Sequence, residues 1–212
     1  MKELDVFFFP ESVAVVGASR KPGKVGHELV KNLLRFFKGR VYPVNPKAEE
    51  VLGLKAYRSI KEIPDRVDLA VIVVPAKHVP EVAEEAGKAG VKGIIVISGG
   101  FKEVGPEGAE LERRLKEAVR KYGMRLIGPN CLGVYVPKSG MNTLFLPSER
   151  QGFPKHGGIA FISQSGAFGS VVLDWAAMRG IGISKFVSYG NKADVDDADL
   201  LTYLREDPDT NV

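Results

Sequence analysis

The fold is decided by the stretch SVAVVGASRKPGKVG, residues 12–26, in which an apolar, β-branched run leads into a glycine-rich loop. The run Ser12–Val16 predicts a strand. Beyond the loop, leucines recur on one side of a helical pattern from Gly26 to Phe37, which predicts an amphipathic helix. A strand, a glycine-rich turn and a helix in this order form the first part of a βαβ unit.

The same alternation of strand and helix continues along the chain. Further strands are predicted at residues 40–44, 69–74, 93–97 and 125–127, and helices at residues 80–89 and 106–122. Leu69–Val74 is apolar throughout, which is typical of a central parallel strand covered on both faces. Residues 1–127 are therefore predicted to form an α/β domain with a Rossmann-like, doubly wound parallel sheet of about five strands.

The pattern restarts after an irregular stretch. Between Gly133 and Gly158 prolines and glycines are frequent, so this stretch is predicted to be a linker or a surface excursion. Strands then follow at residues 158–162 and 184–188, and helices at residues 166–178 and 196–205. So few parallel strands make a poor free-standing sheet. Residues 128–212 are therefore predicted to be an incomplete second α/β domain.

Composition and charge narrow the class of protein. The 212 residues are 44% hydrophobic and 26% charged, with a net charge of +4, as in ordinary globular proteins. The basic residues are scattered, which argues against a nucleic-acid-binding surface. The start of the chain carries acids and no apolar run is long enough for a bilayer, which predicts a cytoplasmic protein without a signal peptide. Glutamine is rare beside Lys, Glu and Arg, a bias of heat-adapted proteins.

The loop at residues 17–26 is a candidate anion site. Backbone N–H groups and the dipole at the start of the following helix favour a phosphate there. The loop lacks the G-x-G-x-x-G spacing of dinucleotide sites and carries Lys24. After the second strand, Asn45 and Lys47 stand where NAD-binding folds place an acid, which favours a ribose phosphate, as in NADP or CoA. A glycine-rich connection without a ligand and a merely solvated Lys47 are the alternatives.

A second candidate anion site is Ser163–Gly166, which follows a predicted strand and opens a predicted helix. The G-x-S-x-G signature of hydrolases is not met, because Ser163 stands two residues before Ser165. Simple helix capping by Ser165 is the alternative. No metal site is predicted, since the three histidines and the single cysteine are dispersed. The acidic residues at 194–199 fit the front of a helix better than a calcium loop.

Six segments of the chain occur together in a recognisable order. They are VAVVGAS with PGKVG (13–19 and 22–26), YPVNP (42–46), VVPA (73–76), SGGF (98–101), GPNCLG (128–133) and SQSG (163–166). With them the chain resembles the amino-terminal part of ADP-forming acetyl-CoA synthetase α subunits, which are NDP-forming acyl-CoA synthetases related to succinyl-CoA synthetase. The resemblance implies a CoA-binding, Rossmann-like domain over residues 1–127. It implies part of a flavodoxin-like, succinyl-CoA synthetase-like domain over residues 128–212.

The resemblance also implies an activity. Members of this family convert acyl-CoA, ADP and phosphate into the free acid, ATP and CoA, through an acyl phosphate and a phosphohistidine. It further implies an oligomer and a partner ATP-grasp subunit or domain that holds ATP or ADP with Mg. None of His27, His78 and His156 matches the phosphorylated histidine, so the catalytic residue is expected beyond Val212. The acid substrate, the choice between ADP and GDP, and whether the chain ends naturally at Val212 are left open by the sequence.

The resemblance assigns two groups of residues to the substrates. The CoA-binding residues would be Gly17, Ser19, Pro22, Gly23, Lys24, Val25, Asn45, Lys47, Pro75, Ala76, Ser98, Gly99, Asn130 and Cys131. The phosphate-binding residues would be Ser163, Gln164, Ser165 and Gly166. Lys47 would lie near the ribose 3′-phosphate, and Asn130 and Cys131 near the thiol end.

A second hypothesis comes from a different class of function. The chain would be a stand-alone regulatory module that senses CoA or a nucleotide without catalysis. This hypothesis accounts for the loops and for the lack of a matching histidine without a missing segment. Asn45 and Lys47 make NAD the less favoured ligand of such a module.

Overall fold

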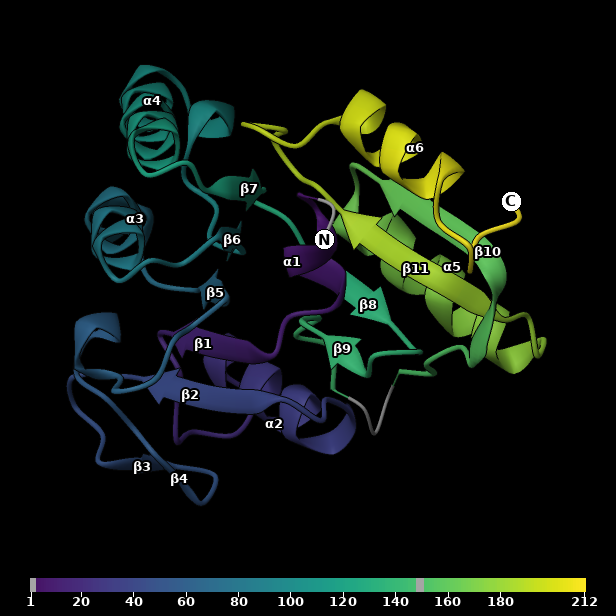
Figure 1. Cartoon of the computed structure of the whole chain (residues 1–212), viewed down its shortest axis with the longest axis horizontal. Helices are drawn as coiled ribbons and strands as arrows, with labels where there is room; N and C mark the ends of the chain where they lie inside the picture. Colours follow the sequence, from purple (N-terminus) through teal and green to yellow (C-terminus); the bar gives the residue numbers. More distant parts are fainter. Residues whose placement is uncertain (1–2, 148–150) are drawn as a thin grey trace.

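A computed structural model describes residues 3–147 and 151–212 and contains two main sheets (Figure 1). The first sheet is parallel throughout. Its strands, in spatial order, are β2 (Arg40–Val44), β1 (Ser12–Val16), β5 (Leu69–Ile72), β6 (Gly93–Val96) and β7 (Arg125–Ile127). The chain winds outward in both directions from β1, so the switch point lies between β1 and β5. The predicted doubly wound parallel sheet is confirmed.

Helices cover both faces of this sheet. Helices α3 (Val79–Lys88) and α4 (Pro106–Lys121) pack on the face to which Ala14 points. Helix α2 (Val25–Phe36) packs on the other face, to which Val15 points. Successive strand residues point to opposite faces, so both faces of β1 are apolar and buried. Shorter elements are the hairpin β3 (Glu50–Val51) and β4 (Leu54–Lys55) and the 3₁₀ turns η1 (Ile60–Glu62), η2 (Ala76–His78) and η3 (Lys102–Val104).

The second sheet is mixed. Its order is β10 (His156–Ser163), β11 (Ile183–Ser188), β8 (Gly133–Val136) and β9 (Met141–Asn142). Strands β10 and β11 are parallel, whereas β8 is antiparallel to both β11 and β9. Helices α5 (Gly166–Met178) and α6 (Asp197–Arg205) belong to this unit. Within the described part of the chain, no helix has the length and apolar character needed to cross a membrane.

The predicted linker between Gly133 and Gly158 is wrong in its first part, because residues 133–142 contribute β8 and β9 to the second sheet. Pro137 and Gly140 mark the turn between these strands, where Gly140 N donates to Pro137 O at 3.3 Å. Both strands are buried throughout, so they lack the alternation of apolar and polar residues that signals a half-exposed strand. Residues 148–150 of the predicted linker lie outside the described residues.

A short helix near the N-terminus, α1 (Asp5–Phe8), lies between the two sheets (Figure 1). Phe7 and Phe8 have no exposed surface. The core around them includes Val15 of the first sheet and Val187 of the second. Tyr203 on α6 packs its ring against Phe8, with 4.9 Å between ring centroids. One hydrophobic cluster is therefore shared by the two sheets.

Candidate functional site

The carboxyl ends of the five parallel strands carry most of the predicted site residues. Their loops cover residues 17–24, 45–47, 73–76, 98–101 and 128–130. The strand order places these loops side by side, from Lys47 at one end to Asn130 at the other. Backbone hydrogen bonds tie neighbours together, as from Gly17 N to Val44 O at 3.0 Å. Four strand spacings of about 4.8 Å make a row of roughly 19 Å.

The loop after β1 folds back tightly on the first turn of α2. Gly17 has φ +96°, a conformation that side chains other than glycine rarely adopt. A Cβ on Gly26 would lie only 2.0 Å from Gly17 O, so only glycine fits there. The backbone at the start of α2 is therefore brought against the end of β1. The predicted residues Pro22–Val25 stay exposed at the edge of the sheet, where the helix N-terminus favours an anion.

Two buried side chains of α2, which the sequence analysis did not assign to the site, hold this loop. His27 Nδ1 lies 3.0 Å from Ser19 O, and Glu28 Oε1 accepts from Gly23 N at 3.1 Å. His27 and Glu28 are 7% and 6% exposed. The only sequence signal for them is that two polar residues fall in the first turn of a helix otherwise buried on that side. The loop conformation therefore depends on side chains behind it.

Removing the Glu28 carboxylate should loosen the loop without unfolding the protein. In Glu28→Ala the Gly23 N–H turns to water, at a cost of about 1 kcal/mol. Trypsin should then cut after Arg20 and Lys24 roughly five times faster, because cleavage of an opened segment follows its equilibrium population. Glu110→Ala on the exposed face of α4 is the control. Equal cleavage rates in the two variants would show that Glu28 does not hold the loop.

Asn45 connects the loops after β1 and β2. Its Nδ2 donates to Ala18 O at 2.7 Å, and its Oδ1 accepts from Lys47 N at 2.8 Å. Its side chain thereby holds the backbones of the two loops together. Lys47 is exposed, and no described residue forms an ion pair with its ammonium group. Lys47 therefore offers a positive charge at one end of the row of loops.

The loops after β6 and β7 meet at the other end of the row. Ser98 Oγ donates to Val74 O at 2.5 Å, and Asn130 N donates to Ser98 O at 2.9 Å. Asn130 has φ +59°, and its Oδ1 lies 3.0 Å from where a Cβ on Gly99 would be. Ser98, Gly99 and Asn130 are thus brought together, with Gly99 and Asn130 exposed.

Cys131 follows Asn130 but points into the core. Its thiol donates to Val96 O at 3.3 Å, and the residue is 5% exposed. Burial raises the pKa of the Cys131 thiol to about 12. The thiol is therefore not placed as a nucleophile on the edge of the sheet.

The second predicted anion site forms the loop between β10 and α5. Ser165 Oγ accepts from Phe168 N at 3.2 Å and caps the helix, while Ser163 Oγ accepts from Ser165 N at 3.2 Å. Gln164 is exposed. A Cβ on Gly166 would lie 2.9 Å from Leu132 Cβ, so this loop packs directly against the segment that follows Asn130. The second candidate anion site therefore adjoins the Asn130 end of the row of loops, at the junction of the two sheets.

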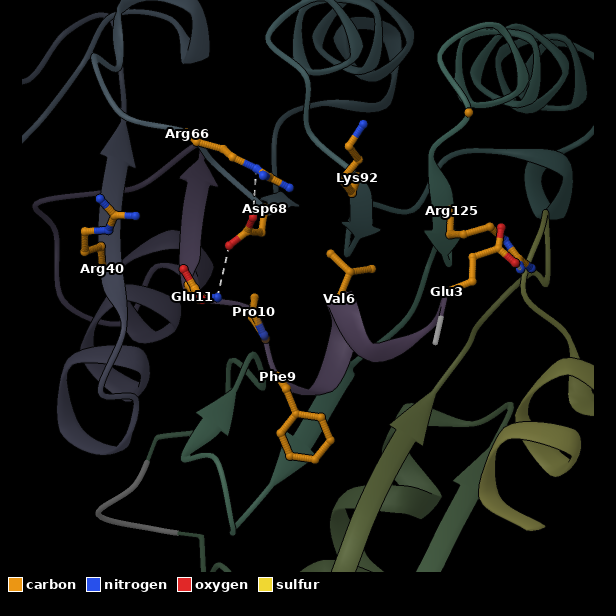
Figure 2. A pocket seen from close by; sticks show the side chains of 11 residues that line it. Glu3, Val6, Phe9, Pro10, Glu11, Arg40, Arg66, Asp68, Lys92 and Arg125 are labelled. Carbon is orange, nitrogen blue, oxygen red and sulfur yellow. Dashed lines mark hydrogen bonds and ion pairs between the residues drawn. The ribbon is translucent and has the colours of Figure 1, made fainter. Parts of the chain in front are cut away.

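A cavity of about 380 Å³ lies at the opposite, amino edge of the first sheet (Figure 2). Figure 2 shows Asp68 joined to Arg66 and to the backbone N–H of Glu11, at 3.4 and 3.0 Å. Lys92 and Arg125 follow the C-terminal ends of α3 and α4, where helix dipoles favour positive charge. No predicted site residue lines this cavity. Helix dipoles and local ion pairs account for its charges, so we do not place the functional site there.

Comparison with known proteins agrees with these two regions. Residues 11–137 match the family model described as CoA binding domain, and residues 156–212 match the model described as succinyl-CoA ligase like flavodoxin domain. The chain is 52% identical over 209 residues to acetate–CoA ligase [ADP-forming] I of Archaeoglobus fulgidus, a match covering 99% of this chain and 30% of that protein. It is 49% identical over 212 residues to acetate–CoA ligase [ADP-forming] I subunit alpha of Pyrococcus furiosus, covering 98% and 45%.

A solved structure shows the same fold. It is dinucleotide forming acetyl-coenzyme A synthetase 1 of Ca. Korarchaeum cryptofilum in complex with phosphate and ADP, with a TM-score of 0.91 and 47% identity. The match covers 100% of this chain and 44% of that one. The chain thus spans less than half the length of these relatives. It belongs to the family of the ADP-forming acetyl-CoA synthetase α subunits and carries a CoA binding domain followed by a succinyl-CoA ligase like flavodoxin domain.

Proposed function

We propose that the chain binds CoA along the carboxyl edge of the first sheet, as part of an ADP-forming acyl-CoA synthetase. The observation that carries this proposal is the row of loops, which begins at the exposed ammonium group of Lys47 and ends at Asn130. Asn130 lies next to the loop formed by residues 163–166. A ligand with phosphates at one end and a reactive group at the other fits such a row. The match to the CoA binding domain model supports it.

Each loop then has a role in holding CoA. The Lys47 ammonium would pair with the ribose 3′-phosphate, and the exposed backbone from Pro22 to Val25 would face the diphosphate at the start of α2. Pro75, Ala76, Ser98 and Gly99 would line the pantetheine arm. Asn130 would lie near the thiol end, with the backbone rather than the buried thiol of Cys131 beside it. We assign residues 1–127 to this domain and residues 128–212 to the phosphate-side domain.

The loop between β10 and α5, residues 163–166, would bind the phosphate that attacks the thioester. A phosphate oxygen would form a bond to the acyl carbon, CoA would leave as the thiolate, and an acyl phosphate would result. The amides of the first turn of α5, beginning at Gly166, would stabilise the charge on the transferring group. ADP and Mg would be held by a partner ATP-grasp subunit or domain, as the resemblance implies.

The three histidines of the chain lie away from this second loop or are already engaged. His156 begins β10 and Ser163 ends it, so the two lie roughly 23 Å apart along the strand. His27 is buried, and its Nδ1 lies 3.0 Å from Ser19 O. His78 immediately precedes α3, which packs on the first sheet. We therefore propose that the phosphohistidine of the family reaction is supplied from outside these 212 residues.

Calorimetry with CoA, dephospho-CoA and NADH tests the ligand. The chain should bind CoA most tightly, and Lys47→Ala should weaken CoA binding roughly tenfold, as expected for a lost charge-assisted hydrogen bond at the surface. Binding of dephospho-CoA should not change in this variant. Lys61→Ala, in the η1 turn near the end of α3, is the matched control. Equal affinity of the wild type for CoA and dephospho-CoA, or tighter binding of NADH, would refute the assignment.

A further inference from the structure

Four polar side chains form a cluster where the loop after β6 meets the second unit. They are Lys102 and Glu103 in the η3 turn, Glu112 on α4 and Asn191 after β11. Neither the sequence motifs nor the proposed contacts with CoA involve them. One of them, Glu103, lies beside the exposed Gly99, which is proposed to line the pantetheine arm: its Oε1 is 3.4 Å from where a Cβ on Gly99 would be. We call this group the η3 cluster.

Asn191 is the centre of the η3 cluster. Its Nδ2 donates to Glu103 Oε2 at 2.6 Å and to Glu112 Oε2 at 3.0 Å. Lys102 Nζ donates to the backbone oxygen of Asn191 at 2.6 Å and pairs with Glu112 Oε1 at 3.3 Å. Asn191 and Glu112 are 9% and 6% exposed. Hydrogen bonds to charged groups in such a buried position are among the stronger ones in proteins.

Glu103 joins this centre to the loop backbone. Its Oε1 accepts from Gly100 N at 2.6 Å and from Phe101 N at 3.1 Å. Burial works to raise the pKa of Glu103, but the hydrogen bonds from Asn191, Gly100 and Phe101 lower it overall, so the carboxylate stays charged at neutral pH. One carboxylate thus binds the loop of the first sheet with one oxygen and a side chain of the second unit with the other.

The segment that carries Asn191 is itself fixed to both candidate loops. Asn191 N donates to Pro129 O at 2.9 Å, and Tyr189 N donates to Ser163 O at 3.2 Å. A Cβ on Gly190 would lie 2.3 Å from Pro129 O, so the two backbones are in direct contact. A shift of this segment would therefore move the loop after β7 and the loop before α5 together.

We propose that Glu103 and Asn191 are positioning residues that hold Ser98 and Gly99 in place for the pantetheine arm of CoA. This inference rests on the proposed function, because it concerns the same row of loops. Without Glu103, the amides of Gly100 and Phe101 lose their acceptor, and the exposed turn is free to move. The adenine nucleotide end of CoA, which would bind three strands away at Lys47, does not depend on this cluster.

The test compares two ligands by calorimetry with the 212-residue chain. CoA has the pantetheine arm, whereas adenosine 3′,5′-bisphosphate contains only its nucleotide end. Glu103→Ala should weaken CoA binding roughly tenfold and change bisphosphate binding less than twofold. Glu103→Gln should retain more of the CoA affinity than Glu103→Ala, because its amide oxygen still accepts from Gly100 N even though the bond from Asn191 is lost. Glu107→Ala, on the exposed first turn of α4, is the control.

Asn191→Ala should reproduce the selective loss, and the double variant should lose no more than either single variant, because the two residues act as one unit. An equal loss for both ligands, or no loss for CoA, would overturn the positioning role while leaving CoA binding by the wild type intact. If the wild type itself does not bind CoA, the proposed function fails, and that outcome is distinguishable from the others. Thermal unfolding of the Glu103 variants should stay close to that of the wild type, because Glu103 is exposed.

Discussion

Gly26→Ala is expected to weaken CoA binding severely, because no side chain fits between the first turn of α2 and the end of β1. The added Cβ would lie 2.0 Å from Gly17 O and 2.9 Å from Gly17 C. Both are backbone atoms of the residue that follows β1, so the helix has to move away. Alanine would otherwise stabilise a helical position by up to about 1 kcal/mol. Overpacking outweighs this gain, and we expect a net loss of roughly 2 kcal/mol.

Calorimetry and denaturant unfolding measure the two effects of Gly26→Ala. The affinity for CoA should fall about 100-fold or more, since the amides of the loop no longer converge. Gly53→Ala, in the turn between β3 and β4, is the control, because no atom lies within 4 Å of its new Cβ and only its φ of +81° is unfavourable. That variant should lose about 1 kcal/mol of stability and little affinity. Normal CoA binding by Gly26→Ala would mean that the loop does not need the close approach of α2.

Lys185→Met is expected to cause the largest loss of stability by a substitution outside the site. Lys185 is 1% exposed, and its Nζ lies 2.6 Å from Asp207 Oδ2. The ammonium also lies 5.3 Å from the centroid of the Phe9 ring. Removing the cation leaves the Asp207 carboxylate buried without its charge partner, which typically costs about 3–5 kcal/mol. The double variant Lys185→Met with Asp207→Leu should recover most of the loss, because no unpaired charge remains.

The pH dependence of unfolding gives this prediction a second readout. Burial works to raise the pKa of Asp207, but hydrogen bonds from Lys185 and Thr210 lower it overall. The folded-state pKa thus lies below the unfolded value of about 3.9, so the ion pair stabilises the protein at neutral pH. This contribution should begin to fall as the pH drops below about 4, and it is lost completely only below the folded-state pKa. Lys185→Met should therefore cost less at pH 3 than at pH 7; an equal cost at both would contradict the ion-pair explanation.

The sequence predicted the first sheet well because its signals are local and strong. The strands at 12–16, 40–44 and 125–127 have the predicted bounds, while the predicted strand 69–74 ends at Ile72. Strands β8 and β9 were missed because they are short, buried and separated by a turn with Pro137 and Gly140. Helix α1 was missed because four residues show no helical period. These elements are stabilised by the shared core rather than by their own pattern.

The candidate site was likewise predicted only in part. Parallel topology alone predicts that the loops after the strands lie along one edge. It does not predict that Glu103 and Asn191, which are 88 positions apart, meet behind one of these loops. His27 and Glu28 were hidden for a related reason, because their role depends on where a glycine-rich loop folds back. The residues that shape the loops are therefore the ones for which a structure is needed.

Helix α1 can reach its final packing during synthesis only after residues near position 203 have been made. Asp5 Oδ1 accepts from the Tyr203 hydroxyl at 2.7 Å, and these residues are 198 positions apart. At about 5–20 residues per second, a ribosome makes Tyr203 roughly 10–40 seconds after Asp5. During that time Phe7 and Phe8 have emerged without α6 and β11 to cover them. The nascent chain therefore exposes this aromatic segment until β11 and α6 have been made.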